Sequence, residues 1–165
     1  DRMMSQTCPD SWSLYLPDEA ATARLAARLA SQARAGDVIA LSGGLGAGKT
    51  SFARAFLRVR AGDPVLEVPS PTFTLVQPYA LPNGAVWHFD LYRLKRPEEA
   101  WELGIEEALG VVIALIEWPE NLGDLLPPEH LEIRLDSAAS PNARRATLTA
   151  SASWISRLAL VAGDV

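Results

Sequence analysis

The chain has 165 residues, of which 48% are hydrophobic and 21% charged, a composition typical of a folded globular domain rather than a disordered segment. A formal net charge of −5 argues against a broad basic face that grips nucleic acid, so we expect no DNA partner. A single cysteine, Cys8, excludes an internal disulfide framework, and no apolar run approaches the roughly 20 residues that span a bilayer. We therefore expect one cytoplasmic domain over 1–165, with residues 1–13 loosely ordered and no membrane partner.

In the first part of the chain, residues 17–35 predict a helix, because Pro17 and the acids Asp18 and Glu19 suit a first turn and Gly36 suits its end. Residues 38–41 form a short apolar run between turn residues, which predicts a strand buried on both faces. A glycine-rich turn follows, and residues 49–60 predict the next helix.

The remaining pattern adds a hairpin and alternating elements. Two β-prone runs, 72–79 and 85–92, flank an Asn83-Gly84 pair, a strong hairpin signal. Further elements are predicted in chain order: a helix over 97–108, strands over 111–116, 131–135 and 146–150, and a helix over 154–161. Together these elements predict an α/β, P-loop NTPase-like three-layer fold, with a mostly parallel central sheet and an antiparallel hairpin addition.

The glycine-rich turn matches the phosphate-binding pattern G-x-x-x-x-G-K-[ST] along its whole length, as Gly43-Gly44-Leu45-Gly46-Ala47-Gly48-Lys49-Thr50. Glycines let successive backbone N–H groups face an anion, and the following helix presents its positive end to the same anion. In this pattern Lys49 serves the β and γ phosphates and the Thr50 hydroxyl serves magnesium. The predicted strand before the turn and helix after it supply the required context, so we predict binding of ATP with Mg²⁺.

Two acids are candidates to complete such a site. Glu117 directly follows the apolar residues 113–116, the position of the carboxylate that holds the magnesium shell in P-loop ATPases; the alternative is a solvated strand end. In an extended strand His88 and Asp90 share one face and can orient a water or the magnesium shell. The alternative there is a hairpin with a satisfied histidine and a surface acid. A zinc pair of His88 with His130 lacks any supporting ligand spacing.

Residues 70–74, Ser-Pro-Thr-Phe-Thr, form a hydroxyl-rich segment after the first P-loop helix. In P-loop proteins a loop at this point can sense the γ-phosphate and reorder on hydrolysis. A proline-stiffened turn leading into a strand is the alternative.

In this order the segments GGLGAGKTSFARAFLR, SPTFTLVQPY, HFDLYRL, WELGI and LIEWPEN resemble the TsaE (YjeE) family, the P-loop ATPases of bacterial tRNA threonylcarbamoyladenosine biosynthesis. The resemblance extends from residue 17 to about residue 145. It implies catalytic roles for Asp90, Glu117 and Lys49, and metal binding by Thr50 and Glu117. It also implies nucleotide contacts at Asp18, Glu19, Gly44, Leu45, Gly46, Ala47, Gly48, Lys49, Thr50, Ser51, Thr72, Asp90 and Arg144, with Arg145 as an alternative to Arg144.

The resemblance further implies work with TsaB- and TsaD-like partners. In the family, the TsaD-like protein transfers the threonylcarbamoyl group to the adenosine next to the anticodon, so tRNA is met indirectly. The resemblance implies that ATP hydrolysis by the TsaE-like subunit, slow alone and dependent on its partners, resets the complex. Trp101 and Trp118 are candidates for partner contacts or for core positions.

Two other functions stay open from the sequence. One is a small-molecule kinase, for which Arg54, Arg58 and Arg60 are available as phosphate-binding lid residues. The other is a nucleotide-gated adaptor in which hydrolysis is not essential. A GTPase is disfavoured, because no N-K-x-D guanine-reading motif follows the second strand.

Overall fold

The computed structural model describes residues 4–163. Its strands are β1 (Ser5–Cys8), β2 (Ser11–Leu16), β3 (Val38–Ser42), β4 (Val76–Tyr79), β5 (Val86–Asp90), β6 (Ile113–Glu117), β7 (Leu131–Ser137) and β8 (Arg144–Ala150). Its α-helices are α1 (Glu19–Gln32), α2 (Lys49–Ala61), α3 (Ile105–Ala108) and α4 (Ala152–Gly163). Two 3-10 helices complete it, η1 (Pro97–Leu103) and η2 (Pro119–Leu125).

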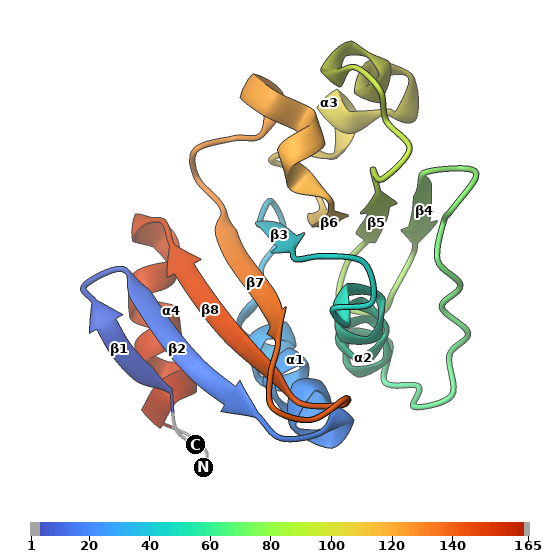
Figure 1. Cartoon of the computed structure of the whole chain (residues 1–165). Helices are drawn as coiled ribbons and strands as arrows, with labels where there is room; N and C mark the ends of the chain where they lie inside the picture. Colours follow the sequence, from blue (N-terminus) through green and yellow to red (C-terminus); the bar gives the residue numbers. More distant parts are fainter. Residues whose placement is uncertain (1–3, 164–165) are drawn as a thin grey trace.

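The strands form one sheet in the order β1-β2-β8-β7-β3-β6-β5-β4 (Figure 1). The central strands β7, β3, β6 and β5 run parallel to one another. Every residue of β3 and β6 is buried, as expected of apolar strands that are covered on both faces. The predicted α/β fold with a parallel centre is therefore confirmed, as is the antiparallel pairing of β4 with β5.

The opposite edge of the sheet was not fully predicted. There β8, β2 and β1 add three antiparallel strands. The expectation that residues 1–13 are loosely ordered is wrong for 5–8 and 11–13, which form β1 and the start of β2; residues 1–3 lie outside the described part of the chain. Strand β2 buries Trp12, Leu14 and Leu16 on one face, and Ser11, Ser13 and Tyr15 alternate with them on the other.

Helices cover the two faces of the sheet unequally. One face packs against α1, α2 and α4 through residues such as Leu25, Phe52 and Trp154. The other face is covered by η1, α3 and η2 beside β3, β6 and β5, where Phe89 and Ile116 lie in a second apolar cluster. On β7 the residues that alternate with the buried ones are half-buried or exposed. The three layers predicted from the sequence are thus present over the parallel centre, and two layers remain toward β1.

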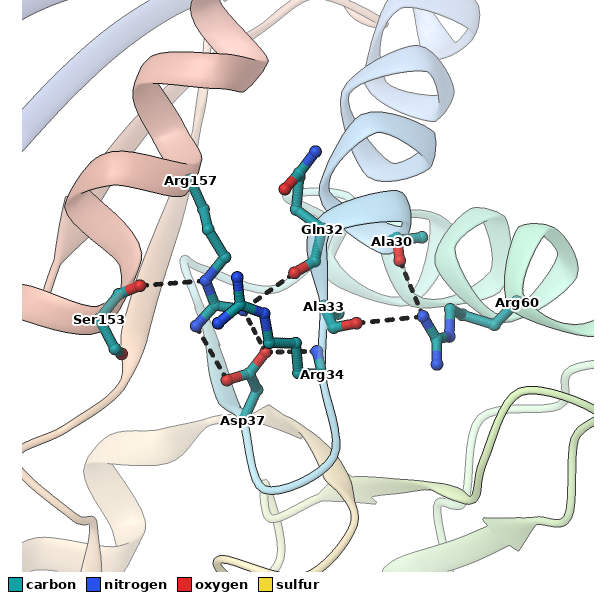
Figure 2. Close-up of polar contacts among 8 residues, drawn as sticks. All are labelled: Ala30, Gln32, Ala33, Arg34, Asp37, Arg60, Ser153 and Arg157. Carbon is teal, nitrogen blue, oxygen red and sulfur yellow. Dashed lines mark hydrogen bonds and ion pairs between the residues drawn. The ribbon is translucent and has the colours of Figure 1, made fainter.

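Helix α1 ends at Gln32, earlier than the predicted end beside Gly36. Its last turn carries no basic residue, and arginines from other helices bind its free carbonyls instead (Figure 2). Arg60 of α2 donates to the carbonyls of Ala30 and Ala33 at 3.1 and 3.2 Å, and Arg157 of α4 donates to that of Gln32 at 2.9 Å. Positive charge at this end also complements the helix dipole.

Arg157 of α4 also forms a buried ion pair, with Asp37. Arg157 contacts both carboxylate oxygens of Asp37, at 2.7 and 3.0 Å (Figure 2), and its side chain is only 3% exposed. Asp37 immediately precedes β3, at the end of that strand opposite the glycine-rich turn. This pair therefore fixes α4 to the parallel centre of the sheet.

The predicted helix over 97–108 is broken into η1 and α3. Gly104 separates them with φ of 78°, a conformation that costs other residues more than glycine. A β-carbon there would also lie 3.3 Å from the Trp87 ring. Composition predicted helical backbone, but the glycine turns the chain between two short pieces.

Candidate nucleotide-binding site

The glycine-rich loop connects β3 to α2 at the carboxyl-terminal edge of the parallel strands (Figure 1). At Gly43, where φ is 138°, a β-carbon would lie 2.4 Å from the Leu135 carbonyl oxygen, so only glycine fits. Gly48 has φ of 102° and gives α2 no side-chain cap. The first backbone N–H groups of α2 are consequently available to an anion.

Lys49, the first residue of α2, is held against this loop. Its Nζ donates to the carbonyls of Gly43 and Gly44 at 2.8 and 2.7 Å, and it lies 4.2 Å from the centre of the Trp118 ring. Burial lowers the pKa of Lys49 below its ordinary value, and the nearby carboxylates, Glu117 first, oppose that shift. The ammonium group is thus fixed against the loop.

Glu117, the last residue of β6, faces the start of α2. It is 2% exposed, so it is not a solvated strand end. The Thr50 hydroxyl lies 3.1 Å from each of its carboxylate oxygens, and His88 Nε2 lies 2.7 Å from Oε2. Strand alternation had predicted that His88 and Asp90 converge on one site; His88 instead binds Glu117 and, unlike Asp90, does not line the cavity described below. His130 bonds the Pro127 carbonyl instead, so the two histidines form no pair.

Asp90, the last residue of β5, is adjacent to Glu117 in the sheet. Its Oδ2 accepts from the Ser70 hydroxyl at 3.0 Å and its Oδ1 from the Tyr92 backbone N–H at 3.2 Å. Its own N–H donates to the carbonyl of Leu75, a residue with φ of 67°. The hydroxyl-rich segment is consequently tied to Asp90 at both ends, and Leu75 holds a conformation that is costly for a bulky residue.

These groups surround one cavity of about 550 Å³. Its lining residues are Glu19, Leu45, Gly46, Ala47, Gly48, Lys49, Thr50, Ser51, Ser70, Thr72, Asp90, Tyr92, Arg93, Glu117, Trp118 and Arg144. The structure thus brings together the predicted site residues except Gly44, whose carbonyl binds Lys49, and Asp18. Asp18 caps α1 by accepting from the Ala21 N–H at 2.8 Å, which is a structural role in the fold.

Arg144, the first residue of β8, crosses to the glycine-rich loop. Its guanidinium donates to the carbonyls of Ala47 and Gly46 at 2.7 and 3.0 Å. The alternative residue Arg145 lies over the Tyr15 ring and reaches Ser13, and it does not line the cavity. Of the two arginines, Arg144 is the one that lines the cavity.

Sequence reasoning missed the aromatic wall of the cavity. The Trp118 ring packs against the Tyr92 ring at a tilt of 47°, with ring centres 4.8 Å apart, and Trp118 has a left-handed backbone with φ of 60°. Strained backbone of this kind recurs at binding sites. The HFDLYR and IEWPE segments contain both aromatics, but nothing in the sequence indicates that their rings meet. Trp101, the other tryptophan considered as a partner contact, is 45% exposed.

The oxygen donors suit magnesium better than a softer metal. Within residues 4–163 no group of three or more His, Cys, Asp and Glu side chains is arranged to hold a metal ion. The hydroxyl of Thr50 and the carboxylate of Glu117 are nevertheless hard oxygen ligands within 3.1 Å of each other. Mg²⁺ is commonly bound by one or two such ligands together with phosphates and water, so the residues present fit the ion.

Fold and site together define an α/β protein built around a phosphate-binding type of loop. The family model for "Threonylcarbamoyl adenosine biosynthesis protein TsaE" matches residues 16–146. The chain therefore belongs to the TsaE family. Across the described residues 4–163, no helix combines the length and apolar character needed to cross a membrane.

Individual relatives agree with this assignment. The tRNA threonylcarbamoyladenosine biosynthesis protein TsaE of Rickettsia felis is 45% identical over 123 residues, which cover 74% of this chain and 71% of that protein. The Bacillus subtilis protein of the same name is 35% identical over 140 residues, 84% of each. The crystal structure of Bacillus subtilis YdiB is similar over 99% of this chain and 98% of that chain, with a TM-score of 0.76 and 27% identity.

Proposed function

We propose that this chain binds ATP with Mg²⁺ and hydrolyses the ATP, and that it does so in tRNA threonylcarbamoyladenosine biosynthesis. The observation that carries the proposal is the convergence of an uncapped helix N-terminus, Lys49 and the carboxylates of Asp90 and Glu117 on a single cavity. Membership of the TsaE family supports the pathway, and the residues of the cavity support the chemistry.

The glycine-rich loop would hold the phosphates. Lys49 supplies a positive charge that is already positioned, which favours charge developing on the γ-phosphate. In a trans peptide the C=O and N–H bonds point in opposite directions. By binding the Ala47 carbonyl, Arg144 therefore turns the N–H of Gly48 away from β8. This arginine both lines the cavity and fixes the shape of the loop.

Thr50 and Glu117 would hold the magnesium ion, with phosphate and water oxygens as its other ligands. When bound, the ion would neutralise negative charge on the phosphate oxygens during hydrolysis. The short separation of the hydroxyl from both carboxylate oxygens is the geometric support for this assignment.

We assign Asp90 to the attacking water. Its carboxylate is oriented by Ser70 and the Tyr92 N–H and still lines the cavity, so it can accept a hydrogen bond from a water. In the reaction the water oxygen bonds to the γ-phosphorus, the bond to the β–γ bridging oxygen breaks, and ADP and inorganic phosphate leave. Thr72 and Ser70 share the loop that Asp90 holds, so this loop is suited to respond to the γ-phosphate.

In the cell we place this activity in the cytoplasm, in a complex with TsaB- and TsaD-like proteins. Hydrolysis, slow in the isolated chain, would reset that complex for another round of modification. The net charge of −5 supports contact with tRNA through the partners rather than through this chain alone. Trp101, exposed on η1, is a candidate contact for those partners.

The kinase alternative loses support from the positions of its arginines. Arg58 donates to the Leu66 carbonyl at 2.9 Å, and Arg60 donates to the end of α1. Both therefore serve backbone packing around α2. A phosphate-binding lid needs arginines that are free to move onto a substrate, and only Arg54 of the three remains for that.

The test is a reconstituted modification assay with TsaB- and TsaD-like partners from the same source, tRNA, ATP, magnesium and the threonylcarbamoyl donor. Modified adenosine per complex is followed with wild-type chain, Glu117→Ala, the exposed-acid control Glu129→Ala, or no chain. We expect many turnovers only with wild type and Glu129→Ala. Equal turnover without the chain would refute the proposal, and full function of a folded Glu117→Ala chain would favour the adaptor alternative.

A further inference from the structure

His88 is a buried histidine to which the proposed reaction gives no task. It lies on β5 with 0% of its surface exposed, one strand away from Glu117 in the parallel sheet. Its Nε2 is 2.7 Å from Glu117 Oε2. A polar side chain this deeply buried is costly unless its hydrogen bond matters to the fold or to the site.

The partners of the imidazole fix its tautomer. A carboxylate can only accept, so Nε2 carries the hydrogen and donates it to Glu117. Among the described residues Nδ1 has no hydrogen-bond partner, and in this tautomer it leaves only a lone pair unsatisfied. The one hydrogen-bond donor of the neutral His88 ring is thereby directed at one oxygen of Glu117.

From this geometry we infer that His88 is the positioning residue for Glu117: it anchors Oε2 so that Oε1 and the Thr50 hydroxyl are held ready for the magnesium ion. The inference rests on the proposed function. A glutamate has one more rotatable bond than an aspartate, and an anchor removes the freedom that this bond adds. Partners of metal-ligating side chains commonly raise metal affinity by orienting the ligand.

Two amide substitutions separate positioning from simple filling of space. His88→Gln can place an amide N–H about where Nε2 lies, whereas His88→Asn places its amide near Nδ1, out of reach of Glu117. Both variants keep a polar, uncharged side chain at a buried position. A role limited to packing predicts no consistent advantage for Gln over Asn at the metal step.

The experiment measures binding of a fluorescent ADP analogue with and without Mg²⁺, and takes the ratio of the two affinities as the magnesium enhancement. We expect His88→Asn to reduce this ratio about tenfold while leaving magnesium-free affinity unchanged. His88→Gln should stay within about threefold of wild type. His130→Asn, at the other histidine of the chain, is the control and should match wild type. Thermal unfolding of each variant reports its folding.

A double-mutant cycle with Glu117→Gln keeps the inference testable if His88→Asn is less stable. If His88 acts through Glu117, the His88→Asn substitution should cause no further loss of magnesium enhancement in a chain that already carries Glu117→Gln. Independent losses in the two backgrounds, or equal losses with and without Mg²⁺, would overturn the inference while leaving nucleotide binding in place. A wild-type chain without magnesium enhancement would instead refute the proposed magnesium site and this inference with it.

Discussion

The parallel centre of the sheet (β7, β3, β6 and β5) and its antiparallel flank (β8, β2 and β1, with α4) contribute different kinds of residue. The centre ends in Lys49, Asp90 and Glu117, which point their charges into the cavity. The flank side supplies Arg144 and Arg157, which bind backbone carbonyls of the loop and of α1. The difference suggests that the centre carries the chemistry and that the flank holds the shape in which the chemistry works.

The sharpest test of the centre is its lysine. Lys49→Ala removes the charge at the loop, so we expect nucleotide affinity to fall about a hundredfold or more. Lys95→Ala is a matched control, because Lys95 is the only other lysine and is exposed. Both are measured by titration with a fluorescent ATP analogue. Comparable affinities of the two folded variants would contradict the assignment of the loop.

The acids of the centre should separate turnover from binding. We expect Asp90→Ala and Glu117→Ala each to lower the rate of ATP hydrolysis about a hundredfold and to weaken ATP binding far less. Asp124→Ala, at an exposed acid, serves as control. Phosphate release gives the rate of hydrolysis, and the amount of bound nucleotide, measured in parallel, gives the binding. Normal turnover by a folded Asp90→Ala/Glu117→Ala double variant would sink the assignment of the site.

The flank should respond in stability. Arg157→Ala leaves Asp37 without its buried partner, so we expect the free energy of unfolding to fall by about 3 kcal/mol. Arg134→Ala, which breaks the exposed pair with Asp136, should cost under about 1 kcal/mol. Denaturant unfolding measures both. If both variants lost the same free energy of unfolding, the buried Arg157–Asp37 ion pair (Figure 2) would have no special role in holding α4.

The smallest expected effect lies where flank meets centre. Arg144→Ala should weaken nucleotide binding about tenfold, since it frees two loop carbonyls from charged hydrogen bonds. Arg145→Ala, one residue along the same strand, should leave binding unchanged. The same ATP-analogue titration distinguishes them. An equal loss in both variants would mean that β8 acts through its overall charge and not through contact with the loop.

Predictability from the sequence follows the same division. Apolar runs at 38–41 and 111–116 predicted the buried centre, because strands covered on both faces need no polar side. The flank strand β2 was missed although Ser11–Leu16 alternates with period two, the pattern of a half-buried strand, because the N-terminal residues were expected to be loosely ordered. Strand alternation placed His88 on the same face of its strand as Asp90, but it could not show that the partner of His88 is Glu117 on β6.

The site was predictable wherever residues act through a local spacing. The glycine-rich loop, Asp90 and Glu117 all lie where central strands end, so their positions in the sequence nearly determine their positions in the fold. Arg144 required the resemblance to a family, and the contact between Tyr92 and Trp118 required the structure, because it depends on a left-handed residue after β6. Asp18 was assigned to the nucleotide, although an aspartate just before a helix is equally suited to cap it.

The pairing of β2 with β8 has a kinetic consequence. Ser11 and Thr149 face each other across 138 positions of chain, and the Arg157–Asp37 pair closes a span of 120. Closing such long spans of chain costs conformational entropy before the contacts at their ends can form, so proteins that depend on these contacts fold slowly. The local hairpin β4–β5 and the β3–loop–α2 unit can form early. The β7–β8 hairpin is also local, so the late step is the addition of β2 and α4, and an immature chain would present an unpaired β8 edge until β2 covers it.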